Sequence, residues 1–152
     1  MASPNENPYL KYALFCRSTE ESIDGDLSLN GIIDLVELPL PEDGPPTQQS
    51  PVLTQVDVNL ALCVGGVEPG EHYLFVALKT PGLPLDTPPA QKVEGEAGIL
   101  FQRWIKTFRI PVQKPGLHTA AILFDGTPLG EASFLVRFKS ERDNYHSTAL
   151  ES

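Results

Sequence analysis

The placement of proline most constrains what this chain can fold into. Fifteen of its 152 residues are proline, and nine of these fall in two segments, residues 39–51 and 81–89. Proline removes a helix hydrogen bond and cannot donate within a β-ladder. Long helices are therefore not expected, and both segments are predicted to be long connections. A third segment, residues 54–64, instead gives the clearest signal of regular structure.

Residues 54–64 alternate strictly between two classes of side chain, with a period of two. This period is typical of a β-strand that has one face in the core and the other towards solvent. The predicted core set is Val56, Val58, Leu60, Leu62 and Val64. The predicted solvent set is Gln55, Asp57, Asn59, Ala61 and Cys63.

Further apolar runs bounded by turn residues predict additional strands. They cover residues 9–17, 27–38, 72–80, 117–124 and 130–138, with a polar loop at 18–26. Residues 98–112 fit one strand, two short strands or a short helix. Asp125-Gly126 is a strong hairpin signal between two apolar runs. Gly31, inside a predicted strand, indicates a bulge or a close neighbour.

This pattern favours an all-β, antiparallel sandwich of about seven to nine strands with Greek-key connections. A closed barrel is the alternative. The length suits one domain, which we place at residues 9–138. Residues 1–8 are predicted to be a flexible N-terminus, and residues 139–152 a polar C-terminal tail.

Two groups of residues carry a resemblance to a known family. They are Lys114-Pro115-Gly116 with His118, Asp125-Gly126 and Gly130, and the run Gly25-x-Leu27-Ser28-Leu29-x-Gly31-Ile32-x-Asp34. Together they resemble an uncharacterised family of bacterial proteins, a domain of unknown function with an immunoglobulin-like β-sandwich, over residues 9–138. The resemblance implies that fold in a bacterial cytoplasm, and no catalytic residue or ligand. His118 stands where such domains usually have tyrosine, so it is either a corner residue bonded to backbone or a general base.

The charge balance argues against several classes of partner. The chain has 11 basic and 20 acidic residues, a formal net charge of -9 and a pI of about 4.7. Nucleic acid and anionic membrane surfaces both require dense positive charge, so neither is expected. No apolar run reaches the ~18 residues of a membrane span, and the first residues lack the pattern of a signal peptide. Cys16 and Cys63 are therefore predicted to be reduced, and the protein to be cytoplasmic.

Motifs that carry chemistry are missing from the sequence. No pair of His and Cys residues has zinc-ligand spacing, and no nucleophile elbow or phosphate loop occurs. We therefore expect no enzyme, no cofactor and no metal. The one alternative is a calcium or small-ligand site in loops at one end of the sandwich, where Asp24 and Asp26 lie near Glu20 and Glu21.

Charge is segregated along the chain. Residues 17–71 contain eleven acids and one base, whereas residues 97–124 contain four bases and no acid. Opposite fields can steer a partner or favour self-association, or the two segments can be neighbours that neutralise each other.

Trp104 is either a core residue or an interface anchor. The sequence predicts a non-enzymatic protein–protein interaction or oligomeric structural module, whose partner is an unidentified protein or another copy of the chain. Its predicted interaction surface consists of Arg103, Trp104, Lys106 and Arg109.

Overall fold

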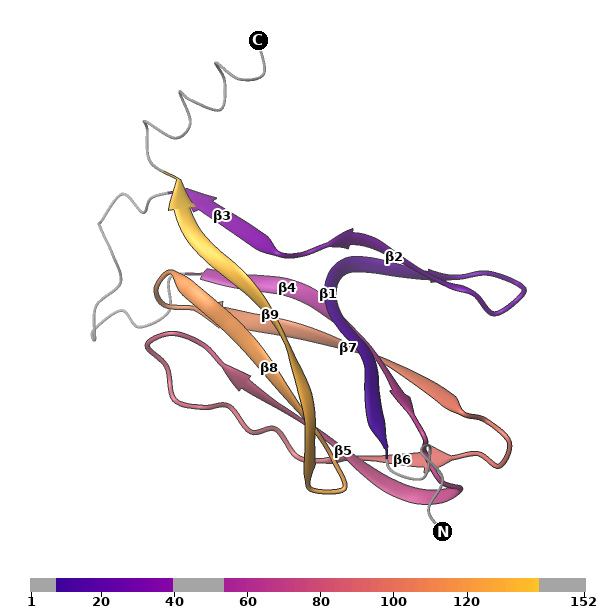
Figure 1. Cartoon of the computed structure of the whole chain (residues 1–152). Coiled ribbons are helices and arrows are strands. Elements are labelled where there is room, and N and C mark those ends of the chain that lie inside the picture. The colour runs from indigo at the N-terminus through magenta and orange to yellow at the C-terminus, as the bar shows by residue number, and fades with distance from the viewer. Residues whose placement is uncertain (1–7, 40–53, 140–152) are drawn as a thin grey trace.

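The computed structural model describes residues 8–39 and 54–139, which form an all-β fold (Figure 1). Most of the predicted N-terminus, first proline-rich connection and C-terminal tail lies outside these described residues. Within them, the strands are β1 (Tyr9–Glu21), β2 (Leu27–Ile32), β3 (Leu35–Pro39), β4 (Thr54–Gly65), β5 (Gly70–Lys79), β6 (Gln91–Gly95), β7 (Phe101–Val112), β8 (Gly116–Phe124) and β9 (Thr127–Lys139).

The strands form two sheets that share one core. The four-stranded sheet has the order β2-β1-β4-β7, and the five-stranded sheet has the order β3-β9-β8-β5-β6. All pairings are antiparallel except β3 with β9, so the prediction of a purely antiparallel fold was wrong at this edge. Phe15 of one sheet meets Phe134 of the other edge to face, with ring centroids 5.1 Å apart. Apolar side chains from both sheets are buried in the same cluster.

The predicted strand 27–38 is divided between the two sheets. At the break, the Ile33 amide donates to the Phe15 carbonyl in the four-stranded sheet. At the following residue, Asp34, the backbone carbonyl accepts a hydrogen bond from the Leu135 amide, which belongs to the five-stranded sheet. Each side of the break thus finds its hydrogen bonds in a different sheet, which is why one apolar run becomes β2 and β3.

The predicted polar loop 18–26 is shorter in the structure, because residues 18–21 belong to β1 and only residues 22–26 form the turn. β1 continues to Glu21 and pairs with β2, and together they extend as a bent arm (Figure 1). We call residues 17–32 the β1–β2 arm. Gly31 has a φ of +65°, and a Cβ there would lie 2.9 Å from Cγ of Arg17. The prediction of a close neighbour at Gly31 is confirmed, since the side chain of Arg17 fills that space.

Two further predictions concern the middle of the chain. Residues 101–112 form one long strand, β7, which decides between the three alternatives for 98–112. The sequence did not indicate β6, whose five residues contain a single buried apolar side chain, Val93.

The Asp125-Gly126 hairpin is confirmed: both residues have positive φ, 49° and 80°, as the tight turn between β8 and β9 requires.

Candidate functional site

The four residues of the predicted interaction surface lie on two opposite faces of β7. Arg103 and Arg109 point away from the core, whereas Trp104 and Lys106 point towards it. This follows from the period of a strand, in which odd and even positions alternate between faces. The four side chains therefore do not form one continuous surface.

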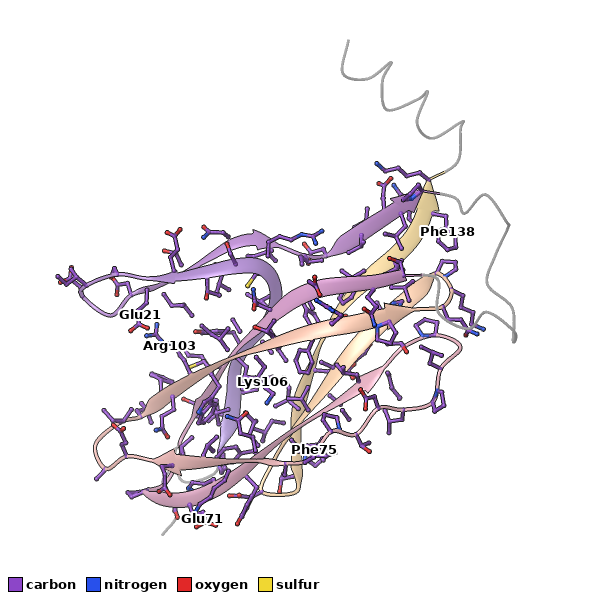
Figure 2. The ribbon with its side chains drawn as sticks, turned by 180° about the vertical axis from the view of Figure 1, so that it is seen from behind. Glu21, Glu71, Phe75, Arg103, Lys106 and Phe138 are labelled. Atoms are coloured by element: carbon purple, nitrogen blue, oxygen red, sulfur yellow. The ribbon has the colours of Figure 1, made fainter. Side chains whose placement is uncertain are left out.

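The two arginines pair with the acidic part of the chain. Nη2 of Arg103 donates to the Gly25 carbonyl at 2.8 Å and lies 3.6 Å from Oε1 of Glu21, at the tip of the β1–β2 arm (Figure 2). Nε of Arg109 donates to Oδ1 of Asp57 in β4 at 3.0 Å. Of the two alternatives for the segregated charges, mutual neutralisation within the fold is what the structure shows for these two arginines.

The two inward residues have structural partners. The Trp104 ring lies against Phe124, with centroids 6.1 Å apart, so the core alternative for this tryptophan is confirmed. Nζ of Lys106 donates to Oε1 of Gln91 in β6 at 2.6 Å, and burial lowers the pKa of this lysine.

β7 is an edge strand that resists the addition of another strand. In the described part of the chain its backbone pairs with β4 alone. An inward charge such as Lys106, and a proline such as Pro111, are both features that discourage pairing at a sheet edge. A partner is therefore more readily accommodated by side-chain contacts on the outer face of β7 than by its backbone.

Polar contacts anchor the β1–β2 arm over the outer face of the four-stranded sheet. At its base, Nδ2 of Asn59 donates to the Arg17 carbonyl at 2.9 Å, and Oγ1 of Thr107 donates to Oδ1 of Asn59 at 2.8 Å. Arg103 holds the tip. The arm is thus tied to both β4 and β7.

Two small side chains on this outer face are buried, contrary to prediction. Ala61 is 0% exposed and Cys63 is 2% exposed, although both belong to the predicted solvent set. Cys63 lies between its register neighbours Tyr12 and Arg103. Cys16, which shares this face, is also buried. Burial raises the pKa of both thiols, which disfavours the reactive thiolate.

The space under the arm is a groove of about 600 Å³. Leu27 from the arm and Phe101 and Ile105 from β7 are apolar side chains of its lining, and we call these three the apolar floor. The complete lining is Glu21, Leu27, Glu94, Glu96, Ile99, Phe101, Gln102, Arg103, Trp104 and Ile105.

The groove carries more negative than positive charge. Three carboxylates line it against one guanidinium, and Arg103 already contacts Glu21 and the Gly25 carbonyl. Glu94 and Glu96 form no ion pair with any other residue that the structure describes. Groove residues come from the arm, from β6 and from the following loop, segments that no local motif connects, so the sequence could not reveal the groove.

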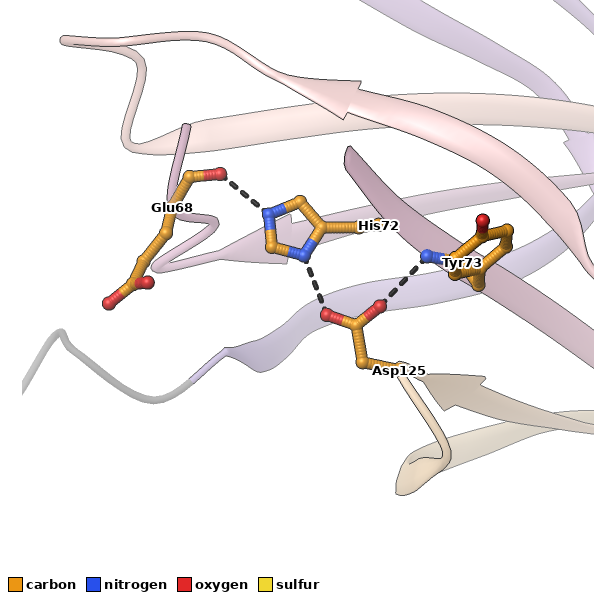
Figure 3. A network of polar contacts seen from close by, with 4 residues as sticks. All are labelled: Glu68, His72, Tyr73 and Asp125. Carbon is orange, nitrogen blue, oxygen red and sulfur yellow. Dashed lines mark hydrogen bonds and ion pairs between the residues drawn. The ribbon is translucent and has the colours of Figure 1, made fainter. Parts of the chain in front are cut away.

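A second polar cluster surrounds His72, which the sequence did not single out (Figure 3). Its Nδ1 lies 2.6 Å from Oδ2 of Asp125, and its Nε2 lies 2.7 Å from the Glu68 carbonyl. Oδ1 of Asp125 accepts from the Tyr73 amide at 2.8 Å. Burial works against the charged ring, but the hydrogen bonds to Asp125 and to the Glu68 carbonyl outweigh it and raise the pKa of His72.

This arrangement is suited to fastening rather than to catalysis. A carboxylate and a carbonyl both accept hydrogen bonds, so both are satisfied when each ring nitrogen of His72 carries a proton. A ring held in this way has no free nitrogen to remove a proton from a substrate. The cluster joins the turn before β5 to the turn between β8 and β9.

His118 is bonded to backbone, as the corner alternative predicts. Its Nδ1 lies 3.1 Å from the Gly116 carbonyl, and its ring stacks on Phe134 with centroids 5.4 Å apart. Burial lowers the pKa of His118.

The alternative calcium loop is organised by other contacts. Oγ of Ser22 accepts from the Asp26 amide at 3.1 Å, and the Gly25 carbonyl accepts from Arg103. Among the described residues, no group of three or more His, Cys, Asp or Glu side chains is placed to hold a metal ion. The described ranges also contain no helix that is long and apolar enough to cross a membrane.

Comparisons with known proteins give little similarity. No family model matches the chain, and no curated protein matches it. A solved structure of Pseudomonas fluorescens alkylpurine DNA glycosylase AlkC, bound to DNA containing an abasic site analog, is similar over 68% of this chain and 27% of that chain. The sequence identity is 19% and the TM-score is 0.41. Similarity at this level says nothing about what this chain does.

Proposed function

We propose that the chain is a non-enzymatic protein–protein interaction module, and that the groove under the β1–β2 arm binds an extended segment of a partner protein. The observation that carries the proposal is the combination of an apolar floor with unpaired carboxylates in one groove of about 600 Å³. Apolar floors provide binding energy, and charged rims provide orientation and selectivity.

The charges of the groove define the chemistry of the partner. Glu94 and Glu96 form no ion pair with the other described residues, although Lys92 lies close enough to Glu94 for electrostatic attraction, and Arg103 is already engaged by the arm. A segment that alternates apolar with basic side chains would satisfy the floor and the two carboxylates together. We therefore propose a cationic, apolar peptide segment as the occupant, and not an acidic one.

The proposal includes an immunoglobulin-like fold. Three features support it: the parallel pairing of β3 with the last strand, the β8–β9 hairpin, and the repeated passage of the chain between the two sheets. In this interpretation β1 is an additional strand between β2 and β4. The bacterial and cytoplasmic setting implied by the family resemblance belongs to the same proposal.

Binding of defined peptides tests the groove. We would titrate the full chain with a blocked peptide that alternates lysine with valine and leucine, and follow backbone amide shifts by NMR. The matched peptide has glutamate in place of each lysine. We expect shifts of the amides of Glu94, Phe101 and Ile105 with the basic peptide alone, weakening as salt is raised.

Variants assign the binding to the two carboxylates. Replacing both Glu94 and Glu96 by glutamine should weaken binding of the basic peptide by about tenfold, which corresponds to about 1.4 kcal/mol. The matched control is Glu131→Gln, an exposed acid on β9 outside the groove. Equal binding of both peptides, or equal loss in the control, would show that the groove is not the site.

A further inference from the structure

Four exposed leucines form a row across the outer face of the five-stranded sheet. Leu35 in β3 is opposite Leu135 in β9, which is in turn opposite Leu117 in β8. Leu85, in the loop after β5, lines the same shallow depression as Leu117, with a volume of about 360 Å³. Their exposed fractions are 40%, 43%, 58% and 53% in this order. Contiguous apolar surface of this kind marks an interaction site more often than isolated exposed residues do.

The two ends of the leucine row have opposite charge. At the end near Leu85, Lys79 lines the depression, and a Cβ on Gly82 would lie 3.1 Å from Cε of Lys114. At the other end lie Asp34, directly before Leu35, and Glu37, on the same face of β3, whose Oε1 accepts a hydrogen bond from Nη2 of Arg137 at 2.8 Å. Lys79, Lys114 and Asp34 take part in no ion pair with the other described residues.

We infer that a second copy of this chain covers the leucine row. An apolar row with a basic end and an acidic end is complementary to itself when two copies meet antiparallel about a twofold axis. Lys79 and Lys114 of each copy then face Asp34 of the other, and leucine packs on leucine between them. Such a contact uses one patch twice, as the commonest homodimers do.

This inference goes beyond the proposed function and is independent of it. The leucine row lies on the outer face of the five-stranded sheet, over β3, β9 and β8, whereas the groove lies along the edge strand β7, between the arm and β6. A dimer formed through the leucines therefore leaves both grooves open, one on each copy, and would present two partner segments at once. Failure of one proposal does not affect the other, because each is tested by a different variant and a different measurement.

Mass in solution tests the inference directly. We would measure the mass of the full chain by sedimentation velocity over a range from micromolar to hundreds of micromolar. We expect a concentration-dependent dimer that weakens as salt is raised, because the charges at the ends of the row are screened. A monomer at every concentration in low salt would overturn the inference.

Leu117→Asp is the decisive variant, since this leucine is the most exposed of the four and its loss leaves the core intact. The dissociation constant should rise at least about tenfold. The matched control is Ile32→Asp, which changes a similarly exposed apolar side chain in β2, on the other sheet. Urea midpoints of both variants establish that they are folded. A dimer that persists in folded Leu117→Asp, or that is lost equally in the control, contradicts the leucine contact.

A charge exchange tests the antiparallel arrangement. Lys79→Glu alone and Asp34→Lys alone should each weaken the dimer, because each places like charges opposite one another. The double variant should restore it, since each copy then carries the exchanged pair. If the loss of dimer affinity in the double variant equals the sum of the losses in the two single variants, the proposed twofold arrangement is wrong.

Discussion

The outer face of the four-stranded sheet lies under the β1–β2 arm, whereas the outer face of the five-stranded sheet carries an open row of leucines. The small side chains Ala61 and Cys63 are buried on the first face, and larger ones such as Leu117 and Leu135 are exposed on the second. Alternation along a strand determines which face a side chain takes. Whether that face meets water depends on what lies across it, here the arm.

The largest expected effect comes from placing a charge beneath the arm. Ala61→Asp buries a carboxylate among apolar neighbours, and the free energy of unfolding should fall by roughly 3 kcal/mol or more. Urea unfolding followed by the fluorescence of Trp104 measures it. The matched variant on the open face is Ser133→Asp in β9, which should change stability by less than about 1 kcal/mol. Similar losses of stability in both variants would mean that the arm does not exclude water from the outer face of the four-stranded sheet.

The second prediction concerns the base of the arm. Asn59→Ala removes the donor to the Arg17 carbonyl and the acceptor for Thr107, so stability should fall by about 1–3 kcal/mol. Hydrogen exchange should show faster exchange of arm amides than of the amides in β8 and β9. The control is Asn30→Ala on the arm itself, where an exposed amide bonds only to Ser18 and less than about 0.5 kcal/mol is expected. Unchanged exchange in the arm would rule out this anchor.

A smaller effect separates the two outward arginines of β7. The side chain of Arg109 and its partner Asp57 are 69% and 70% exposed, so Arg109→Ala should cost less than about 0.5 kcal/mol. The Arg103 side chain is 33% exposed and holds the tip of the arm, so Arg103→Ala should cost about 1 kcal/mol. Chemical denaturation of both variants makes the comparison. If Arg109→Ala lowers the free energy of unfolding more than Arg103→Ala does, this ranking of the two arginines is wrong.

The smallest expected effect is on the pH dependence of stability. It comes from the hydrogen bonds of His72 to Asp125 and to the Glu68 carbonyl. The pKa of His72 is raised in the folded protein, so its contribution is fully present below the unfolded value of about 6.5. That contribution is lost as the pH rises through the folded pKa. The contribution of His118 to stability depends on pH in the opposite direction. The pKa of His118 is lowered in the folded protein, so its contribution is lost as the pH falls.

Comparing wild type with His72→Gln isolates the first histidine, since His118 is present in both proteins. The difference in unfolding free energy should be largest at pH 5.5 to 6 and shrink towards pH 8, as estimated from the ordinary histidine pKa of about 6.5. NMR titration of the two rings is an independent measurement. A difference that grows with pH would show that the charged ring is not the stabilising form.

Much of the fold follows from local patterns in the sequence. Strict alternation identified β4 and its core set, and Asp125-Gly126 located the last hairpin. β6 gave no signal because it is short and buries one apolar residue, Val93. The division of residues 27–38 between sheets depends on hydrogen bonds to Phe15 and Leu135, which lie far away in the chain, and no local pattern records them.

The candidate site was predicted only in part. The sequence pointed to the basic residues within 98–112 but left one strand, two short strands or a short helix open there, and it treated four residues close in sequence as neighbours in space. In a strand, adjacent side chains point to opposite faces, so Arg103 and Trp104 lie on opposite sides of β7, although both line the groove at this edge. The groove and the His72 cluster both depend on contacts between distant segments. His72 and Asp125, for example, are 53 residues apart.

The parallel pairing of β3 with β9 has a consequence for how the chain is made. Glu37 and Arg137, which face each other across this pair, are 100 residues apart. A chain emerging from the ribosome completes β3 early and cannot supply its partner until the last strand has been synthesised. Contacts of such long separation slow folding and leave strand edges unpaired in the meantime. The pairing of β3 therefore waits for the synthesis of β9, and a chain that stopped before β9 would leave one edge of both β3 and β8 unpaired.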